Sequence, residues 1–96
     1  MPYKILLAPE AVEDLGRLRA YDKAKVRDAI KQLGNDPTRV SRSRIKRLRG
    51  MQKPQYRLRV DEIRVFYDVV EGPKRRVEVL AIVPKGEAAN GSSEKV

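Results

Sequence analysis

The part of the chain that decides the fold is QYRLRVDEIRVFYDVVEGPKRRVEVLAIV, residues 55–83, in which two polar turns separate three apolar-rich runs. In the first two runs, apolar side chains alternate with charged or polar ones. Because successive side chains of a strand point to opposite faces, this alternation predicts two half-buried strands. The third run, RVEVLAIV, is more completely apolar and predicts a third strand. The turns are expected at Asp61-Glu62 and at residues 71–75, so the three strands should pair as consecutive hairpins.

The N-terminal part of the chain predicts one more strand and a first helix. Residues 3–8 contain a short apolar run that is typical of a buried strand. Pro9 suits the first turn of a helix, because its missing N–H has no intrahelical partner there. Val12, Leu15 and Leu18 recur at helical spacing. They predict an apolar stripe on one side of this helix.

A second helix is predicted directly after the first. Asp22 is the expected N-cap, since its side chain can accept a hydrogen bond from a free N–H of the first turn. The helix itself should cover residues 23–33, with three apolar residues on one side: Val26, Ile30 and Leu33. Gly34 and the breakers that follow it should end the helix. The two helices are therefore expected to form a hairpin with one apolar side.

This element order predicts an α+β domain, β-α-α-β-β-β, with a mostly antiparallel four-stranded sheet and the helical hairpin packed on one face. The opposite face of the sheet should then be open. Ninety-six residues are enough for one modest core. The expected organisation is a single domain over residues 1–85. Residues 86–96 are small, polar and glycine-bearing, and they predict a flexible C-terminal tail.

The net charge of +9 comes from one segment of the chain. Residues 39–60 contain nine Lys or Arg and no Asp or Glu, whereas the other 13 basic residues are balanced by all 13 acidic ones. A localised basic block is typical of a surface that binds a polyanion, either a nucleic acid or an acidic protein. The alternative is a solvated surface that keeps the protein soluble.

Several classes of site are excluded by composition. The chain has neither cysteine nor histidine. Disulfides, thiol chemistry, an imidazole base and zinc sites that need those ligands are therefore excluded, and no metal site or cofactor is predicted. No apolar run approaches the ~20 residues of a membrane span, and the N-terminus does not resemble a signal peptide. These features predict a cytoplasmic protein without membrane contact.

The arginines of the predicted sheet are the candidate functional residues. Period 2 places Arg57 and Arg59 together on one side of their strand, while Arg64 and Phe66 should lie on the open side of the next strand. Guanidinium groups bind phosphate in bidentate fashion and keep their charge. Such a surface can bind RNA or DNA. It can also stabilise the charge that develops when an RNA 2′-hydroxyl attacks the neighbouring phosphate.

Each of these residues also has a purely structural interpretation. Arg57 and Arg59 could be the solvated side of an edge strand, where basic residues discourage aggregation. Arg64 could be paired with Asp68 or Glu78 instead of facing a ligand. The core-facing parity of two tyrosines, Tyr56 and Tyr67, predicts that they are packing residues.

Four motifs resemble the RelE/ParE superfamily of bacterial and archaeal toxin–antitoxin modules: LRGM (48–51), YRLRV (56–60), IRVFYDV (63–69) and VEVLAIVPKGE (77–87). The likeness extends over about residues 1–88. It implies a RelE-like, microbial-ribonuclease-like fold. RelE-like members cut mRNA in the ribosomal A site and leave a 2′,3′-cyclic phosphate, whereas ParE-like relatives poison DNA gyrase. In both branches an antitoxin neutralises the toxin.

The resemblance also implies roles for individual residues. Arg57, Arg59 and Arg64 match basic catalytic positions of RelE-like toxins. Lys85 is the expected replacement, as a positive charge, for the arginine that follows the last strand of those toxins. Arg49, in the LRG motif, matches a basic residue that helps to hold RNA. The other expected RNA-binding residues are chosen by their charge or by their place on the arginine side: Lys46, Arg47, Lys53 and Phe66. The chain departs from the RelE pattern after its last predicted strand, because no tyrosine or histidine follows Tyr67.

The favoured hypothesis is a ribosome-dependent mRNA endoribonuclease, or mRNA interferase, that inhibits translation. Its expected partners are the ribosome, mRNA and a cognate antitoxin whose acidic segment wraps the basic surface. Contact with DNA is expected only through the antitoxin complex. Three alternatives remain open: a ParE-like gyrase inhibitor, a catalytically degenerate binder of the same fold, and a basic nucleic-acid-binding protein unrelated to toxicity.

Overall fold

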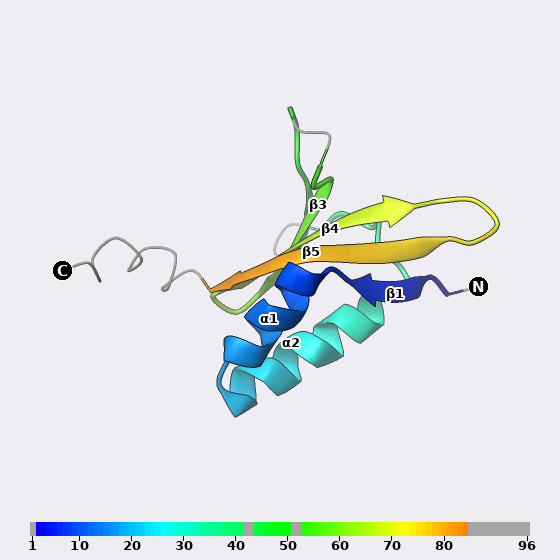
Figure 1. Cartoon of the computed structure of the whole chain (residues 1–96). Helices are drawn as coiled ribbons and strands as arrows, with labels where there is room; N and C mark the ends of the chain where they lie inside the picture. The colour runs from blue at the N-terminus through cyan, green and yellow to red at the C-terminus, as the bar shows by residue number, and fades with distance from the viewer. Residues whose placement is uncertain (1, 42–43, 51–52, 85–96) are drawn as a thin grey trace.

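The structure, a computed structural model, describes residues 2–41, 44–50 and 53–84. The elements in chain order are β1 (Lys4–Leu7), α1 (Pro9–Arg17), α2 (Ala20–Leu33), β2 (Ile45–Arg47), β3 (Tyr56–Val60), β4 (Ile63–Val70) and β5 (Arg76–Pro84). Both helices lie on the same side of the sheet, as Figure 1 shows. The α+β class and the hairpin of helices on one face are thus confirmed.

The described strands form one sheet in the order β1-β5-β4-β3-β2. Strand β1 is parallel to β5, and the other three pairings are antiparallel. The prediction of four strands was wrong by one, because β2 adds a fifth at the edge beside β3. The sequence of β2 is IKR, which has one apolar residue in three. A strand of three residues is too short to show alternation in the sequence. Strand β2 is recognised only from its pairing with β3 in the structure.

Helix α1 begins at Pro9, as expected, but it buries a different stripe from the one predicted. Ala11 is fully buried, Leu15 and Leu18 pack against the core, and Val12 is 56% exposed. Ala11, Leu15 and Leu18 follow i, i+4, i+7 spacing, and Val12 lies one residue, or about 100°, further round the helix. The prediction that Val12 belongs to the apolar stripe was therefore wrong. A small alanine was the correct starting point of the stripe.

Helix α2 starts earlier than predicted. Its N-cap is Arg19, which makes no side-chain capping bond, and Asp22 lies inside the first turn. Asp22 is therefore not the N-cap, although a carboxylate in the first turn still interacts favourably with the helix dipole. The predicted apolar residues Val26, Ile30 and Leu33 are all buried. Among the described residues, no helix is long and apolar enough to cross a membrane.

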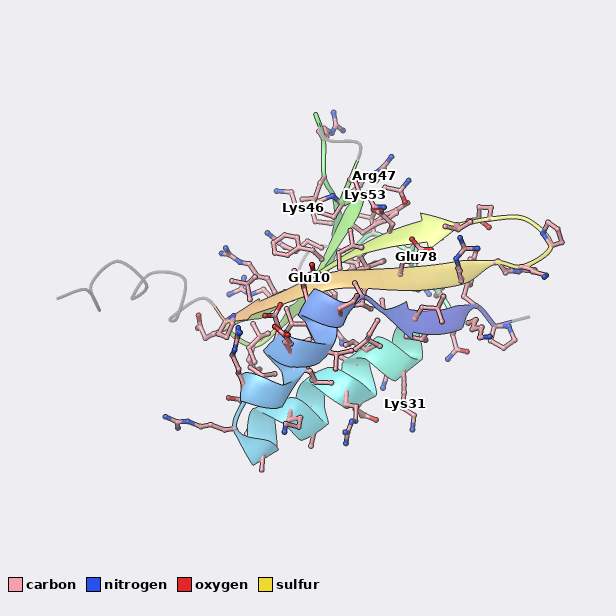
Figure 2. All side chains as sticks on the ribbon, viewed as in Figure 1. Glu10, Lys31, Lys46, Arg47, Lys53 and Glu78 are labelled. Carbon is pink, nitrogen blue, oxygen red and sulfur yellow. The ribbon has the colours of Figure 1, made fainter. Side chains whose placement is uncertain are left out.

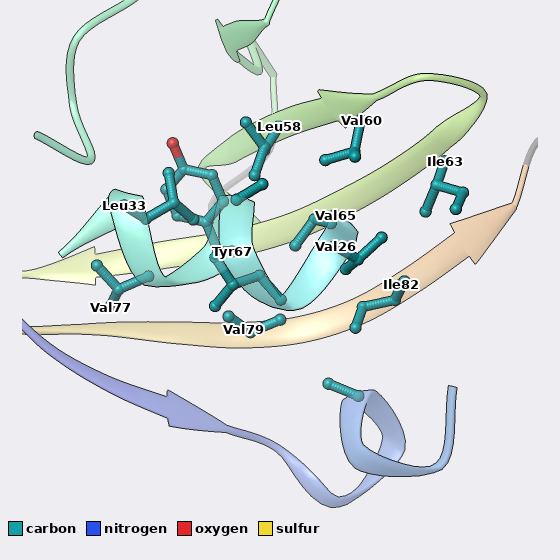
Figure 3. Packing of buried hydrophobic residues seen from close by; sticks show 13 residues of the cluster. Val26, Leu33, Leu58, Val60, Ile63, Val65, Tyr67, Val77, Val79 and Ile82 are labelled. Carbon is teal, nitrogen blue, oxygen red and sulfur yellow. The ribbon is translucent and has the colours of Figure 1, made fainter. Parts of the chain in front are cut away.

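The core lies between the sheet and the two helices, as Figure 3 shows. One row of side chains crosses the sheet on the helix side, because the register aligns Ile45, Leu58, Val65 and Ile82 on neighbouring strands. Tyr67 is fully buried, and its ring stacks on that of Tyr56 at 5.4 Å between centroids. The predicted packing role of both tyrosines is confirmed.

A β-bulge in β5 separates two halves of the sheet. Phe66 pairs with Ala81 and Tyr67 with Val79, so Leu80 is an extra residue with no partner on β4. The carboxylate of Asp14, from α1, accepts a hydrogen bond from the backbone N–H of Ile82 at 3.0 Å. The helix therefore supports the strand just after the irregularity, and the alternation of buried and outward-facing side chains is kept on both sides of it.

Tyr67→Phe should lower the free energy of unfolding by about 1–3 kcal/mol. The Tyr67 hydroxyl donates a buried hydrogen bond of 2.6 Å to the carbonyl of Pro37, and phenylalanine would leave that carbonyl unsatisfied. Burial also raises the pKa of Tyr67. The neutral hydroxyl is therefore favoured in the folded state, and this contribution to stability decreases as the pH rises above the unfolded pKa of about 10. Urea unfolding at pH 7 and pH 10.5 measures both effects, and an unchanged midpoint at pH 7 would contradict the first.

Candidate nucleic-acid interface

The face of the sheet opposite the helices carries a group of basic residues. Cross-strand partners share a face, and the register gives one row, Lys46–Arg57–Phe66, and a second row, Arg59–Arg64. These five residues, Lys46, Arg57, Arg59, Arg64 and Phe66, are called the basic face below. The structure therefore brings together three of the four predicted catalytic residues and two of the predicted RNA-binding residues.

Two arginines of the basic face stand directly opposite each other. Arg59 on β3 and Arg64 on β4 are register partners. Like charges in such positions destabilise a sheet, because their Cβ atoms are only about 5 Å apart. Among the described residues, neither of them nor Arg57 forms an ion pair with a carboxylate. Their mutual repulsion is thus not offset by an acidic side chain of the described chain.

The carboxylates that were considered as partners of Arg64 are engaged elsewhere. Asp68 is 7% exposed and accepts a hydrogen bond of 2.7 Å from the backbone N–H of Gln55. Glu78 accepts a hydrogen bond of 2.7 Å from Nε of Arg76. The structural interpretation of Arg64 as half of an internal ion pair is therefore wrong. Its guanidinium is left for a ligand or solvent.

The turn between β3 and β4 orients Arg59. Asp61 adopts a left-handed conformation, with φ of 56°, and its backbone carbonyl accepts a hydrogen bond of 3.2 Å from Nε of Arg59. The Asp61 carboxylate instead pairs with Lys25 of α2, and this hydrogen bond raises the pKa of Lys25. The turn thus holds the Arg59 side chain through a neutral group, while Lys25 binds the nearby negative charge.

Arg57 is half-buried between its register partners Lys46 and Phe66. Its Nε is buried and has no hydrogen-bond partner within the described part of the chain. An unsatisfied buried donor costs about 1–3 kcal/mol, and in native proteins it calls for an explanation. Arg57 is therefore held in a position that internal stability alone does not favour.

Other predicted RNA-binding residues lie away from the basic face. Arg47 is the register partner of Tyr56, and its guanidinium lies over that ring at 5.1 Å while Nη1 donates a hydrogen bond of 3.0 Å to the Gln55 carbonyl. Lys46 and Arg47 consequently point to opposite sides of the projecting end of the sheet (Figure 2). Arg49 is exposed just after β2. Lys85, the fourth predicted catalytic residue, lies outside the described residues.

Sequence reasoning missed the support of this region, which is Gln55. Its side-chain Oε1 accepts a hydrogen bond of 2.8 Å from the N–H of Val69, while its own N–H donates to Asp68. Nζ of Lys53 lies 3.9 Å from the same Asp68 carboxylate. These contacts fix the end of the β2–β3 connection against β4. The sequence feature that could have indicated this support is Asp68, an acidic residue on the side of its predicted strand that faces away from the core and close to a basic segment.

This arrangement can bind phosphate but offers few other chemistries. The described residues contain no group of three or more acidic side chains that could hold a metal ion. Arginines on an open face can bind a phosphodiester and stabilise extra negative charge on it. The geometry therefore fits a nucleic-acid interface, and the protonation of guanidinium at any biological pH keeps it positively charged.

Comparison with known proteins agrees with the fold. The model of a family described as ParE toxin of the type II toxin–antitoxin system parDE matches residues 5–89. No match was found among curated proteins.

Three solved structures are similar in fold. The toxin–antitoxin complex RelBE2 from Mycobacterium tuberculosis contains a chain with 25% identity and a TM-score of 0.72, and the match covers 88% of this chain and 99% of that one. A chain of the RelE–RelB complex from Pyrococcus horikoshii has 22% identity and a TM-score of 0.71, and the match covers 90% of this chain and 98% of that one. A mutant of Escherichia coli toxin RelE in the free state has 24% identity and a TM-score of 0.67, and the match covers 98% of this chain and 94% of that one. Since the family model spans most of the sequence, the chain belongs to the ParE toxin family, within the RelE/ParE superfamily of type II toxin–antitoxin systems.

Proposed function

We propose that this toxin is an endoribonuclease that cuts mRNA on the ribosome and so inhibits translation. The observation that carries the proposal is the placement of Arg57, Arg59 and Arg64 on one open face without a carboxylate partner among the described residues. A cluster of this kind is unfavourable in the free protein. It becomes favourable when a phosphodiester that gains negative charge lies against it.

The proposed reaction is attack by the RNA 2′-hydroxyl on the adjacent phosphorus. A bond forms between the 2′-oxygen and phosphorus, and the bond between phosphorus and the 5′-oxygen breaks. The 2′-hydroxyl loses its proton and the leaving 5′-oxygen gains one, so the products are a 2′,3′-cyclic phosphate and a 5′-hydroxyl. We assign the two non-bridging oxygens to Arg59 and Arg64, which are register partners, and the neighbouring phosphate to Arg57.

Proton transfer needs a group other than these arginines, because guanidinium stays protonated at biological pH. The described residues include no histidine, since the chain has none. We assign this step to Lys85 or to groups of the ribosome and solvent. Dependence on the ribosome follows naturally, because the basic face supplies charge and orientation but no obvious base.

The proposed partner in the resting cell is an antitoxin with an acidic segment that covers the basic face. The solved relatives include complexes of RelE with RelB. An acidic segment would neutralise the facing arginines in the same way as RNA, and charge complementarity would speed the encounter. Inhibition would then result from direct competition for Arg57, Arg59 and Arg64.

Inhibition of DNA gyrase is the second candidate function. Two observations favour it: the matching family model is that of ParE toxins, and no tyrosine or histidine follows Tyr67, where RelE-like toxins have one. This candidate uses the same fold but places no demand on the basic face as a site of cleavage.

A single pair of assays separates these functions. In a purified translation system, the protein should cut a reporter mRNA only while it is translated, and primer extension should map the cuts to codons in the ribosomal A site. Naked mRNA should stay intact, and supercoiling by purified gyrase should be unaffected. Intact translated mRNA together with inhibited gyrase would reject the endoribonuclease proposal in favour of the second candidate.

A further inference from the structure

A second group of basic residues lies at the far end of the sheet. An open depression of about 880 Å³ is bounded by the N-terminal segment and by the turn between β4 and β5. Figure 1 shows this turn and the N-terminus at the same end of the molecule. Four basic residues line the depression, and they are called the hairpin surface below: Lys4, Lys74, Arg75 and Arg76.

The nearby acids are already engaged. Both carboxylate oxygens of Glu71 accept hydrogen bonds from the Tyr3 hydroxyl, at 2.8 and 3.0 Å. Glu78 is bound to Arg76. Among the described residues, Lys4, Lys74 and Arg75 form no ion pair. Three of the four basic residues of the hairpin surface are therefore free of ion pairs with described residues, and their charge exceeds the single negative charge of Glu71.

The same contacts hold the hairpin surface in shape. The bond between Tyr3 and Glu71 ties β1 to the turn, and the Arg75 guanidinium lies over the Tyr3 ring at 5.0 Å. Gly72 adopts a φ of 112°, which a residue with a side chain rarely adopts, and this allows the tight turn. Because Arg75 and the backbone of the turn are held in the free protein, binding of a ligand would cost little entropy for ordering them.

Two residues of the hairpin surface, Lys4 and Arg76, lie on the face of the sheet that carries Arg64. Buried Val77 and Val79 point to the core, so Arg76 points to the opposite side, and Lys4 is its register partner. Arg64 pairs with Val83 and so lies seven residues along β5 from Arg76, which corresponds to about 23 Å at ~3.3 Å per residue. A stacked single strand with ~3.4 Å per nucleotide needs about seven nucleotides for that distance.

We propose that the hairpin surface is a second RNA-binding surface, which holds the backbone of a single strand whose other part lies on the basic face. The basic face and the hairpin surface are two separated groups of cations. Both can bind phosphates of one single-stranded nucleic acid, because its negative charges are evenly spaced. A single strand can follow the twisted sheet, whereas a duplex is stiff over about 50 nm. The choice of RNA over DNA rests on the proposed function. Binding at the hairpin surface does not require cleavage.

The test compares a 12-nucleotide and a 4-nucleotide single-stranded RNA, using fluorescence anisotropy with the free toxin. The variant is Lys4→Gln with Lys74→Gln, since both side chains are exposed. Loss of two phosphate contacts should reduce the slope of log K against log[salt] by about 1.4 for the 12-mer. The decrease in affinity between 50 and 200 mM salt should then be about sevenfold smaller than in the wild type. The 4-mer reaches only one surface at a time and can bind at either, so it should show a smaller difference in slope than the 12-mer.

Two matched controls make the result specific. Arg27→Gln with Lys31→Gln removes the same charge from exposed positions of α2, and Figure 2 shows Lys31 pointing away from the sheet. This control should keep the wild-type slope, and Lys4→Arg with Lys74→Arg should also keep it. An unchanged slope in the glutamine variant, an equal change in the α2 control, or an effect confined to a DNA 12-mer would overturn the proposal. Cleavage on ribosomes is measured separately, so its absence would reject only the proposed function.

Discussion

Arg64→Ala is expected to lower the rate of mRNA cleavage on translating ribosomes by about 10²–10³-fold, the effect typical of removing one preorganised donor from a charged transition state. Arg64 is half-buried on β4, faces Arg59 across the strand pair, and has no carboxylate partner among the described residues. Its guanidinium is thus available to a phosphate ligand on the open face. Single-turnover primer extension over a time course measures the rate directly.

The stability of the same variant distinguishes a functional from a structural role. Because Arg64→Ala removes a like-charge pair, its free energy of unfolding should be unchanged or slightly higher than that of the wild type. Arg27→Ala, at an exposed position of α2, provides the matched control and should cut mRNA at the wild-type rate. Equal rates for Arg64→Ala and the wild type would rule out the assigned role. A large loss of stability would show that Arg64 is a structural residue.

The sheet could be predicted from the sequence because its strands are long enough to show their period. Leu58 and Val65 alternate with arginines, and this alternation fixed both the strands and the side on which each arginine lies. The burial of Leu58 and Val65 follows from the same pattern. The part of the basic face on β3 and β4, which comprises Arg57, Arg59, Arg64 and Phe66, was therefore predictable before any contact was known.

Other features depend on contacts that a local pattern does not contain. Strand β2 is only three residues long and exists because β3 offers it a partner. The stripe of α1 was shifted by one residue, because Ala11 is buried and the larger Val12 is not. Local hydrophobicity ranks valine above alanine, whereas close packing against β5 favours the smaller side chain.

The limits of the site prediction have the same origin. Arg47 was grouped with the RNA-binding residues by its charge, but the pairing of β2 turns it towards Tyr56. The engagement of Asp68 by Gln55 was equally invisible, because these residues lie 13 positions apart and meet only when β3 pairs with β4. Charge composition identifies a segment, and strand register decides which of its side chains act together.

Leu58→Ala is expected to lower the free energy of unfolding by about 2–5 kcal/mol, the range for removing a large aliphatic side chain from a packed core. Leu58 is 1% exposed and lies in the row that crosses the sheet from Ile45 to Ile82. A domain of this size has only about 5–15 kcal/mol of stability, so the variant should melt about 10 °C or more below the wild type. Thermal and urea unfolding measure the change.

Val12→Ala is the matched control for this prediction. It also removes an aliphatic side chain, but from a position that is 56% exposed, so the free energy of unfolding should change by no more than about 0.5 kcal/mol. Leu58 also stands between Arg57 and Arg59, and its burial keeps both arginines pointing to the open face. RNA affinity of the folded Leu58→Ala protein should therefore fall with its stability, whereas that of Val12→Ala should not. Equal losses of stability in the two variants would contradict the assigned orientation of α1.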